Sequence, residues 1–212
     1  MTLSRMIVAL AGEADDRFAT WDRVAALAPE LFAAGALEIR LAYFGREGRL
    51  QTRPFIAAHW VAGADDLVDL MDRARSNCVC GCFVQIGDIL EHALREPKPL
   101  QAVVIIGDCF HGDLQAALAA ARKLRDPGPR FFLVAQERSA ADSFHALAAA
   151  GGGACVELGS PQIERIAERL PGTLEAVAHF AVGGEAALER HGGECAGLLL
   201  DQVTRRIGQR RP

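Results

Sequence analysis

The sequence has little of what marks nucleic-acid-binding proteins. Its 212 residues carry a formal net charge of only -4, and aromatic residues make up 6%. The one concentration of positive charge is a C-terminal run, Arg205, Arg206, Arg210 and Arg211. That run is short enough to be a solvated terminus and not a binding arm. We therefore predict that the chain has no nucleic-acid partner.

Membrane-spanning and secretory segments are also missing. No apolar run approaches the roughly 20 residues that cross a bilayer, and residues 1–10 are too short for the apolar region of a signal peptide. In a chain of this size, 6 cysteines do not make a disulfide scaffold, so we interpret them as reduced thiols. These observations predict a cytoplasmic protein without a membrane partner.

Motifs of the commonest enzyme classes are absent. The sequence has no P-loop, no Gly-x-Gly-x-x-Gly after a strand and no Gly-x-Ser-x-Gly elbow. The glycines at positions 151–153 precede a predicted strand, so they end a helix and do not cradle a phosphate. One feature of the sequence could still belong to an enzyme. Asp108 ends a predicted strand and Cys109 follows it, an arrangement that would suit a hydrolase of α/β type.

The most informative stretch that is present is residues 100–106 (LQAVVII), which is almost continuously apolar and rich in β-branched residues. This pattern is typical of a strand buried on both faces, as in a parallel sheet covered by helices. The run ends at Gly107 and Asp108, and helical spacing resumes at Leu114. Open α/β sheets bind ligands at the carboxyl ends of their strands, so Asp108 is a candidate site residue.

Strands and helices alternate along the rest of the chain. Further strands are predicted at residues 6–10, 37–44, 49–56, 130–135 and 154–158. The pair at 37–44 and 49–56 forms a hairpin, which adds one antiparallel edge strand. The fold class is therefore α/β, a Rossmann-like three-layer sandwich with a mostly parallel sheet. Its central strand should be residues 100–106, with residues 6–10 and 130–135 parallel on either side.

Capping and breaking residues predict the helix boundaries. Thr20 is placed as the N-cap of a helix that follows a polar loop at residues 11–19, and Pro29 bends that helix. A later helix begins at Ser160-Pro161, and Pro171 with Gly172 is expected to interrupt it.

Three segments together resemble the von Willebrand factor A-type (VWA) domain of the bacterial intracellular kind. They are residues 6–22 with Thr20-Trp21-Asp22, Gln85-Ile86-Gly87 followed by a helix, and residues 104–108 (VIIGD). The resemblance implies a VWA-like α/β domain over residues 1–180. Residues 181–212, with Gly183-Gly184, would be a C-terminal extension packing on the same domain.

The family's metal-ion-dependent adhesion site (MIDAS) is degenerate in this sequence. The family binds a divalent cation through Asp-x-Ser-x-Ser after the first strand, a threonine from a later loop and an aspartate ending the fourth strand. Asp108 matches the last ligand, but the first motif reads AGEAD at positions 11–15, and Val84 replaces the threonine. A register shifted by one residue would place Gly12, Ala14 and Asp16 at the motif positions instead.

Two interpretations of the altered site remain open. Glu13, Asp15 and Asp108 could form a rebuilt site for Mg²⁺ or Ca²⁺, both of which take oxygen ligands. Alternatively the site is inactive and these carboxylates are solvated or paired with Arg17. We favour the inactive site without a cofactor, because converging carboxylates repel one another when no cation neutralises them.

Thiols and a histidine are predicted near the same end of the sheet. Cys78, Cys80 and Cys82 alternate along one segment, while Cys109 and His111 follow Asp108. The four cysteines could hold Zn²⁺ or sense redox state, and we expect at least two of them in contact; the alternative is that they are small packing residues. His111 could orient a carboxylate or ligate a metal, or it is a surface loop residue.

Three function classes follow from these observations. The first is a non-enzymatic protein-interaction module of VWA type, without a working Mg²⁺ site, that binds another protein within an intracellular assembly. The second is a metal- or thiol-dependent regulatory protein that uses the four cysteines. The third is an α/β hydrolytic enzyme.

Overall fold

The structure is a computed structural model that describes residues 3–11, 14–47, 51–56, 59–75, 86–96, 99–110, 112–125, 128–158 and 163–208. Side chains are described throughout these ranges except at 14–18, 44–47, 51–56, 163–168 and 205–208. Its strands are β1 (Ser4–Ala11), β2 (Leu37–Glu47), β3 (Gln51–Ile56), β4 (Ala102–Gly107), β5 (Arg130–Ala135) and β6 (Ala154–Glu157). Its helices are α1 (Ala14–Ala26), α2 (Ala28–Ala33), α3 (Ala64–Arg75), α4 (Ile86–Arg95), α5 (Leu114–Leu124), α6 (Arg138–Gly151), α7 (Ile163–His191) and α8 (Gly193–Gly208).

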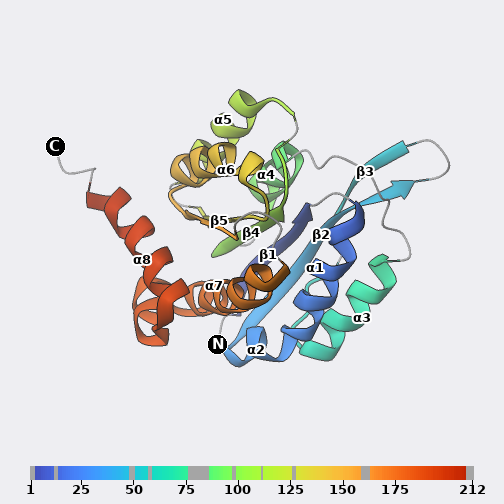
Figure 1. Ribbon diagram of the computed structural model, residues 1–212, viewed down its shortest axis with the longest axis horizontal. Helices are drawn as coiled ribbons and strands as arrows, with labels where there is room; N and C mark the ends of the chain where they lie inside the picture. Colours follow the sequence, from blue (N-terminus) through green and yellow to red (C-terminus); the bar gives the residue numbers. More distant parts are fainter. Residues whose placement is uncertain are drawn as a thin grey trace.

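The described strands form one sheet in the order β3-β2-β1-β4-β5-β6 (Figure 1). β1 pairs parallel with both β2 and β4, and β5 pairs parallel with both β4 and β6. β3 pairs antiparallel with β2 at the edge. The prediction that the strand near residues 100–106 is central, between parallel neighbours, is confirmed. The strand begins two residues later than predicted, at Ala102, although the backbone of Gln101 is already hydrogen-bonded to Arg5 and Arg130 of the neighbouring strands.

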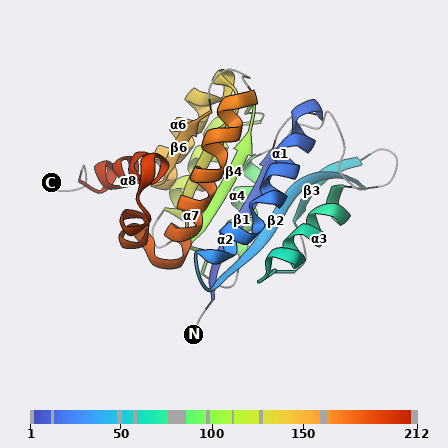
Figure 2. The ribbon, with the colours of Figure 1, turned by 60° about the horizontal axis from the view of Figure 1, so that its bottom comes forward.

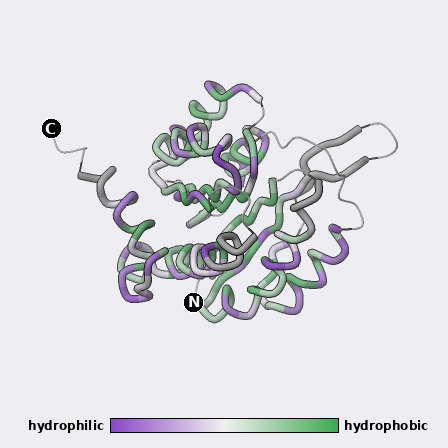
Figure 3. Tube along the Cα trace, viewed as in Figure 1, coloured by the Kyte–Doolittle hydropathy of each residue, from purple (hydrophilic) through white to green (hydrophobic). Residues whose placement is uncertain are grey.

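The sheet is buried on both faces because its central strands are apolar on both sides. Val104 and Ile106 of β4 face one hydrophobic cluster, together with side chains from α1, α2, α3 and α7. Val103 and Ile105 face the other, together with side chains from α4, α5 and α6. This two-residue alternation is the geometry of a strand. The result is the predicted three-layer α/β arrangement. Figure 1 shows the sheet between α4, α5 and α6 on one side and α1, α3 and α7 on the other, and Figure 2 views it from the side of α1 and α7. Figure 3 shows the strands between these layers as largely hydrophobic.

Two predicted helix boundaries are wrong. Thr20 lies inside α1, which already begins at Ala14, so it does not cap that helix. Acidic residues in a first turn interact favourably with the helix dipole, which accounts for a start at Ala14-Asp15-Asp16. α7 continues through Pro171, and its non-helical residues are Gly183 and Gly184 instead.

The C-terminal helices contribute to the core. Leu188 of α7 and Leu199 and Val203 of α8 are fully buried in the cluster that covers one face of the sheet. The backbone turns sharply at Gly184, whose φ of +64° and ψ of -155° suit only glycine. The division at residue 180 stays a prediction. No helix in the described part of the chain combines the length and the apolar character needed to cross a bilayer.

Candidate functional site

Asp108 stands at the carboxyl end of the central strand, where the sequence places it. It directly follows Gly107, which pairs with Ala11 of β1 on one side and Ala135 of β5 on the other. Asp108 therefore lies at the end of the sheet where three parallel strands finish side by side (Figure 1). This is the end of an open α/β sheet at which ligands bind.

Local hydrogen bonds hold the loop around Asp108. The Cys109 thiol donates to the Asp108 carboxylate, with 3.0 Å between Sγ and Oδ1. The Ser139 hydroxyl, in the first turn of α6, donates to the Asp108 carbonyl at 3.3 Å. Asp108 and Cys109 are both half-buried. The loop thus places a carboxylate and a thiol next to each other at the end of β4.

Ala11 occupies the position beside Asp108 from which the resemblance would supply the first metal ligand. It is the last residue of β1, 4% exposed, and pairs with Gly107. A Cβ on Gly107 would lie 3.0 Å from the Ala11 carbonyl oxygen and 3.2 Å from its Cβ. The two strand ends approach closely, and the last described side chain of β1 beside the end of β4 is the methyl group of Ala11.

A buried polar pair lies at the same end and was not predicted. Gln136 follows β5 as Asp108 follows β4, and its amide donates to the Thr20 hydroxyl with 2.7 Å between Nε2 and Oγ1. Its backbone N–H donates to the Gly107 carbonyl at 2.8 Å. Both side chains are buried. The rule that singled out Asp108, a polar residue directly after an apolar strand, would also have found Gln136.

An acidic cavity borders the Asp108 loop. Its volume is about 140 Å³, and its lining includes Asp88 and Glu91 of α4 and Phe110, Gly112 and Asp113 of the loop. Burial raises the pKa of Asp88, and the nearby Glu91 raises it further. Asp113 also caps α5, because its carboxylate accepts from the N–H groups of Gln115 and Ala116. The cavity therefore suits a positively charged group.

Most of the other predicted site residues lie outside the described residues. These are Glu13, Cys78, Cys80, Cys82 and His111. Asp15 belongs to the first turn of α1, but its side chain is not described. Within the described ranges, no three histidine, cysteine or carboxylate side chains gather to hold a metal ion. The rebuilt cation site and the thiol cluster stay predictions.

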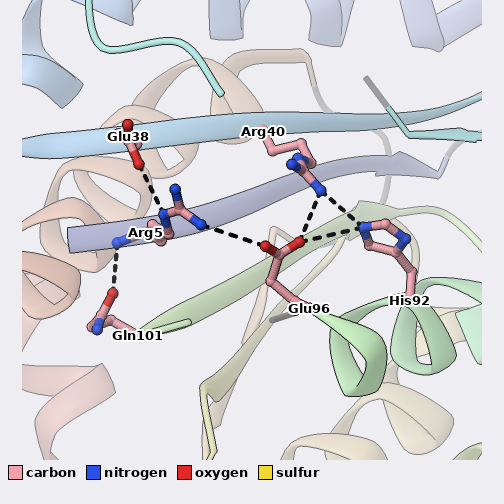
Figure 4. A network of polar contacts seen from close by, with 6 residues as sticks. All are labelled: Arg5, Glu38, Arg40, His92, Glu96 and Gln101. Carbon is pink, nitrogen blue, oxygen red and sulfur yellow. Dashed lines mark hydrogen bonds and ion pairs between the residues drawn. The ribbon is translucent and has the colours of Figure 1, made fainter. Parts of the chain in front are cut away.

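A second polar cluster lies at the opposite end of the sheet (Figure 4). Glu96, which follows α4, accepts from Arg5 of β1 at 3.4 Å and from Arg40 of β2 at 2.8 Å. Arg5 also donates to Glu38 of β2 at 2.8 Å. Its backbone N–H donates to the side-chain carbonyl of Gln101. The Glu96 side chain is only 4% exposed, so this carboxylate joins two strands and a helix in a mostly buried setting.

Trp60 completes this cluster. The guanidinium carbons of Arg5 and Arg40 lie 4.6 and 4.4 Å from the centre of its ring, within the range of cation–π attraction. Burial is the main cause of the lowered pKa of Arg40; the neighbouring Arg5 adds to it, and Glu96 opposes it. The cluster ties the starts of β1, β2 and β4 together and has no counterpart in the sequence-based predictions.

His92 makes this cluster sensitive to pH. Its neutral Nε2 lies 3.2 Å from Arg40 Nη1 and accepts from it. Burial and the charge of Arg40 lower the pKa of His92 below the ordinary value of 6.5. The unfolded chain then binds a proton more readily than the folded one. We expect the free energy of unfolding to fall as pH drops below 6.5 and down through the lower folded pKa.

The measurement is urea unfolding of wild type and His92→Gln between pH 7.5 and 5. Because glutamine does not titrate here, the variant should lose less stability on acidification than wild type does. Equal losses in both proteins would show that His92 does not contribute. Other histidines contribute equally to both curves and cancel in the difference.

Comparison with known proteins shows the fold. No family model matches the sequence, and no curated protein matches it. Among solved structures, 63 chains match. One is the VWA domain of SpRpn10, with a TM-score of 0.59 and 13% identity over 79% of this chain and 95% of that one.

Two further matches contain the same fold within longer chains. Proximal thread matrix protein 1 from the mussel byssus, with a zinc-occupied MIDAS motif, has a TM-score of 0.58 and 12% identity over 83% of this chain and 46% of that one. PilB minor pilin from Streptococcus sanguinis has a TM-score of 0.58 and 9% identity, over 84% and 62% respectively. This chain therefore spans about half to two thirds of those proteins. Together the matches show that the chain has a VWA-type fold.

Proposed function

We propose that this chain is a non-enzymatic protein-interaction module of VWA type. Another protein binds at the carboxyl end of its sheet, around Asp108, without a Mg²⁺ site. The observation that carries this proposal is the methyl group of Ala11 beside the end of β4. A small, hard ion that has lost a side-chain ligand completes its shell with water, which it does equally well in bulk solvent.

The charge of this end indicates what such a partner presents. Asp88, Glu91 and Asp113 line the cavity beside the Asp108 loop, and Glu137 is exposed next to Ser139. With a cation, a VWA-type site attracts an acidic side chain of its partner. Without one, the same end stays negative and favours a lysine or arginine side chain. The module would then act in an intracellular assembly, with residues 181–212 as an extension of its domain.

A second candidate function is thiol-dependent regulation, which the Cys109 contact favours. Its thiol donates to the Asp108 carboxylate at 3.0 Å, so oxidation of Cys109 would remove a hydrogen bond at the proposed binding end. A thiol titration, combined with elemental analysis of protein purified without added metal, separates this function from the first. Bound zinc, or a disulfide involving Cys109 that forms on mild oxidation and is opened again by reductant, would favour regulation.

Calorimetry tests the metal part of the proposal. We expect wild type to give no binding heat with Mg²⁺ and at most weak heat with Ca²⁺, and Asp108→Ala to behave in the same way. Ala11→Asp places a carboxylate where the resemblance has one, and it should increase affinity for either ion. Tight Mg²⁺ binding by wild type that Asp108→Ala abolishes would contradict the proposal.

Charge reversal tests the interaction part. A Glu91→Lys, Glu137→Lys double variant should lose the proteins that wild type retains from native extract, and addition of EDTA should leave the wild-type set unchanged. Glu189→Lys, an exposed position on α7, is the matched control for added positive charge. If the double variant retains the same proteins as the control, binding does not use this end of the sheet.

A further inference from the structure

β6 is the last strand of the described sheet on the side opposite β3. Successive residues of a parallel strand direct their backbone groups alternately to either side. Leu158, just after β6, donates its N–H to the Ala135 carbonyl of β5, so Cys155 directs its N–H and C=O outward. Outward groups of this kind can pair with a further strand, although the N–H of Gly153, at the start of β6, already donates to the Ala148 carbonyl at 2.9 Å.

The outward groups of Cys155 are occupied by one side chain of α8. The Cys155 N–H donates to Gln202 Oε1 at 2.9 Å, and Gln202 Nε2 donates to the Cys155 carbonyl at 2.8 Å. A carboxamide offers one acceptor and one donor in a plane, like the peptide group of a neighbouring strand. The Gln202 side chain thus makes the two hydrogen bonds that one residue of a neighbouring strand would make.

The other described contacts of α8 are polar at its start and apolar along its inner face. Glu194 pairs with Arg169 of α7 at 3.6 Å, and the Cys195 thiol donates to the Arg169 carbonyl at 3.7 Å. Ala196, Leu199 and Val203 are buried against the core cluster. The helix is joined to α7 through Gly192 and Gly193, which both have positive φ, +70° and +84°. α8 begins after this glycine pair, contacts β6, and extends outward toward the C-terminus (Figure 2). α8 therefore covers the outer edge of β6 and is joined to α7 through two glycines.

We propose that β6 is a strand-addition surface that α8 covers, and that displacement of α8 lets β6 pair antiparallel with β6 of a second copy. An antiparallel pair centred on Cys155 is symmetric, as a two-fold dimer requires. It places Glu157 of each copy opposite Gly153 of the other. This surface is distinct from the carboxyl end of the sheet and does not depend on the function proposed there.

The charges at the two ends of β6 are complementary in this arrangement. Arg125 and Arg130 flank its beginning: a Cβ on Gly152 would lie 3.1 Å from Arg130 Nη1 and 3.4 Å from Arg125 Nε. Glu157 stands at its other end and is exposed, with its carboxylate 2.7 Å from His145 Nε2. Each acidic end of the dimer therefore approaches a basic end. Such complementarity favours this register over a parallel one.

The test displaces α8 without altering the sheet. Leu199→Asp puts a charge at a fully buried position on the inner face of α8, and the full-length variant should expose the Cys155 amide to hydrogen exchange. We expect its association constant, measured by sedimentation equilibrium, to rise at least about tenfold over wild type. Adding Glu157→Arg, which brings like charges together, should reverse that rise.

Each other outcome overturns the proposal. Faster Cys155 exchange without association would show that the open edge does not pair with a second copy, even if it accepts an added peptide of residues 151–158. Association that Glu157→Arg leaves unchanged would come from the apolar face of α8. If Leu199→Asp does not fold, Gln202→Ala replaces it. Thr204→Ala is the matched control, because the described hydrogen bonds of the Thr204 hydroxyl lie within α8. Equal association of these two variants would equally overturn the proposal.

Discussion

An Ile105→Asp variant is expected to lose about 4 kcal/mol or more of its free energy of unfolding, because it buries a carboxylate that has no partner. Ile105 is fully buried in the middle of the central strand and packs under α5 and α6. The whole free energy of unfolding of a domain is typically about 5–15 kcal/mol. The variant should therefore be largely unfolded under mild denaturing conditions.

Urea unfolding followed by circular dichroism measures this effect. Ile105→Val, which removes one methyl group, is the matched core control and should cost about 0.5–1.5 kcal/mol. Leu94→Asp introduces the same charge at a position on α4 that is 41% exposed, and it should change stability by no more than about 0.5 kcal/mol. If Ile105→Asp unfolds at the same urea concentration as Leu94→Asp, β4 is not buried on both faces.

The part of the fold that could be predicted from the sequence is the part that local pattern determines. An unbroken run of β-branched residues predicts a strand covered on both sides, and β4 has that environment. The end of this run at Gly107 predicts that Asp108 stands at the carboxyl end of the central strand, and the structure confirms that position. These inferences need only neighbouring residues.

Helix boundaries depend on contacts that no local pattern contains. Pro171 is expected to break its helix because it lacks an N–H and crowds the preceding turn. In α7 the chain continues, with Leu170 and Leu174 fully buried on either side of the proline. Apolar burial on this scale outweighs the roughly 3 kcal/mol that an internal proline costs. Helix propensity alone does not show whether the cost of the proline or the stabilisation from apolar burial is larger.

The polar cluster around Glu96 was not predictable because its members are far apart in the sequence. Arg5 and Glu96 are separated by 91 positions, and Arg40 and Glu96 by 56. Read one at a time in the sequence, each of these charged residues is of a type that is usually found at the protein surface. Only the parallel pairing of β1 with β2, and the packing of α4 over them, brings the charges together.

A Glu96→Gln variant is expected to lose about 3 kcal/mol of unfolding free energy, because removing one partner of a buried ion pair leaves the other charges uncompensated. Here two guanidinium groups, of Arg5 and Arg40, would remain beside Trp60. Glu38 would be left as the carboxylate bonded to Arg5. Glutamine keeps the volume of the side chain, so a cavity does not contribute to the loss. Calorimetric melting and urea unfolding at pH 7 measure the difference.

Glu91→Gln is the matched control, because Glu91 pairs with Arg95 at a similar distance of 2.9 Å but on the exposed face of α4. Both of those side chains are more than half exposed, at 58% and 77%. Solvent screens such a pair, which typically contributes about 0.3–0.5 kcal/mol. Added salt should weaken this exposed pair further and leave the Glu96 effect nearly unchanged. Equal losses in the two variants would show that burial does not strengthen the dependence on Glu96, and the cluster would then be a surface network.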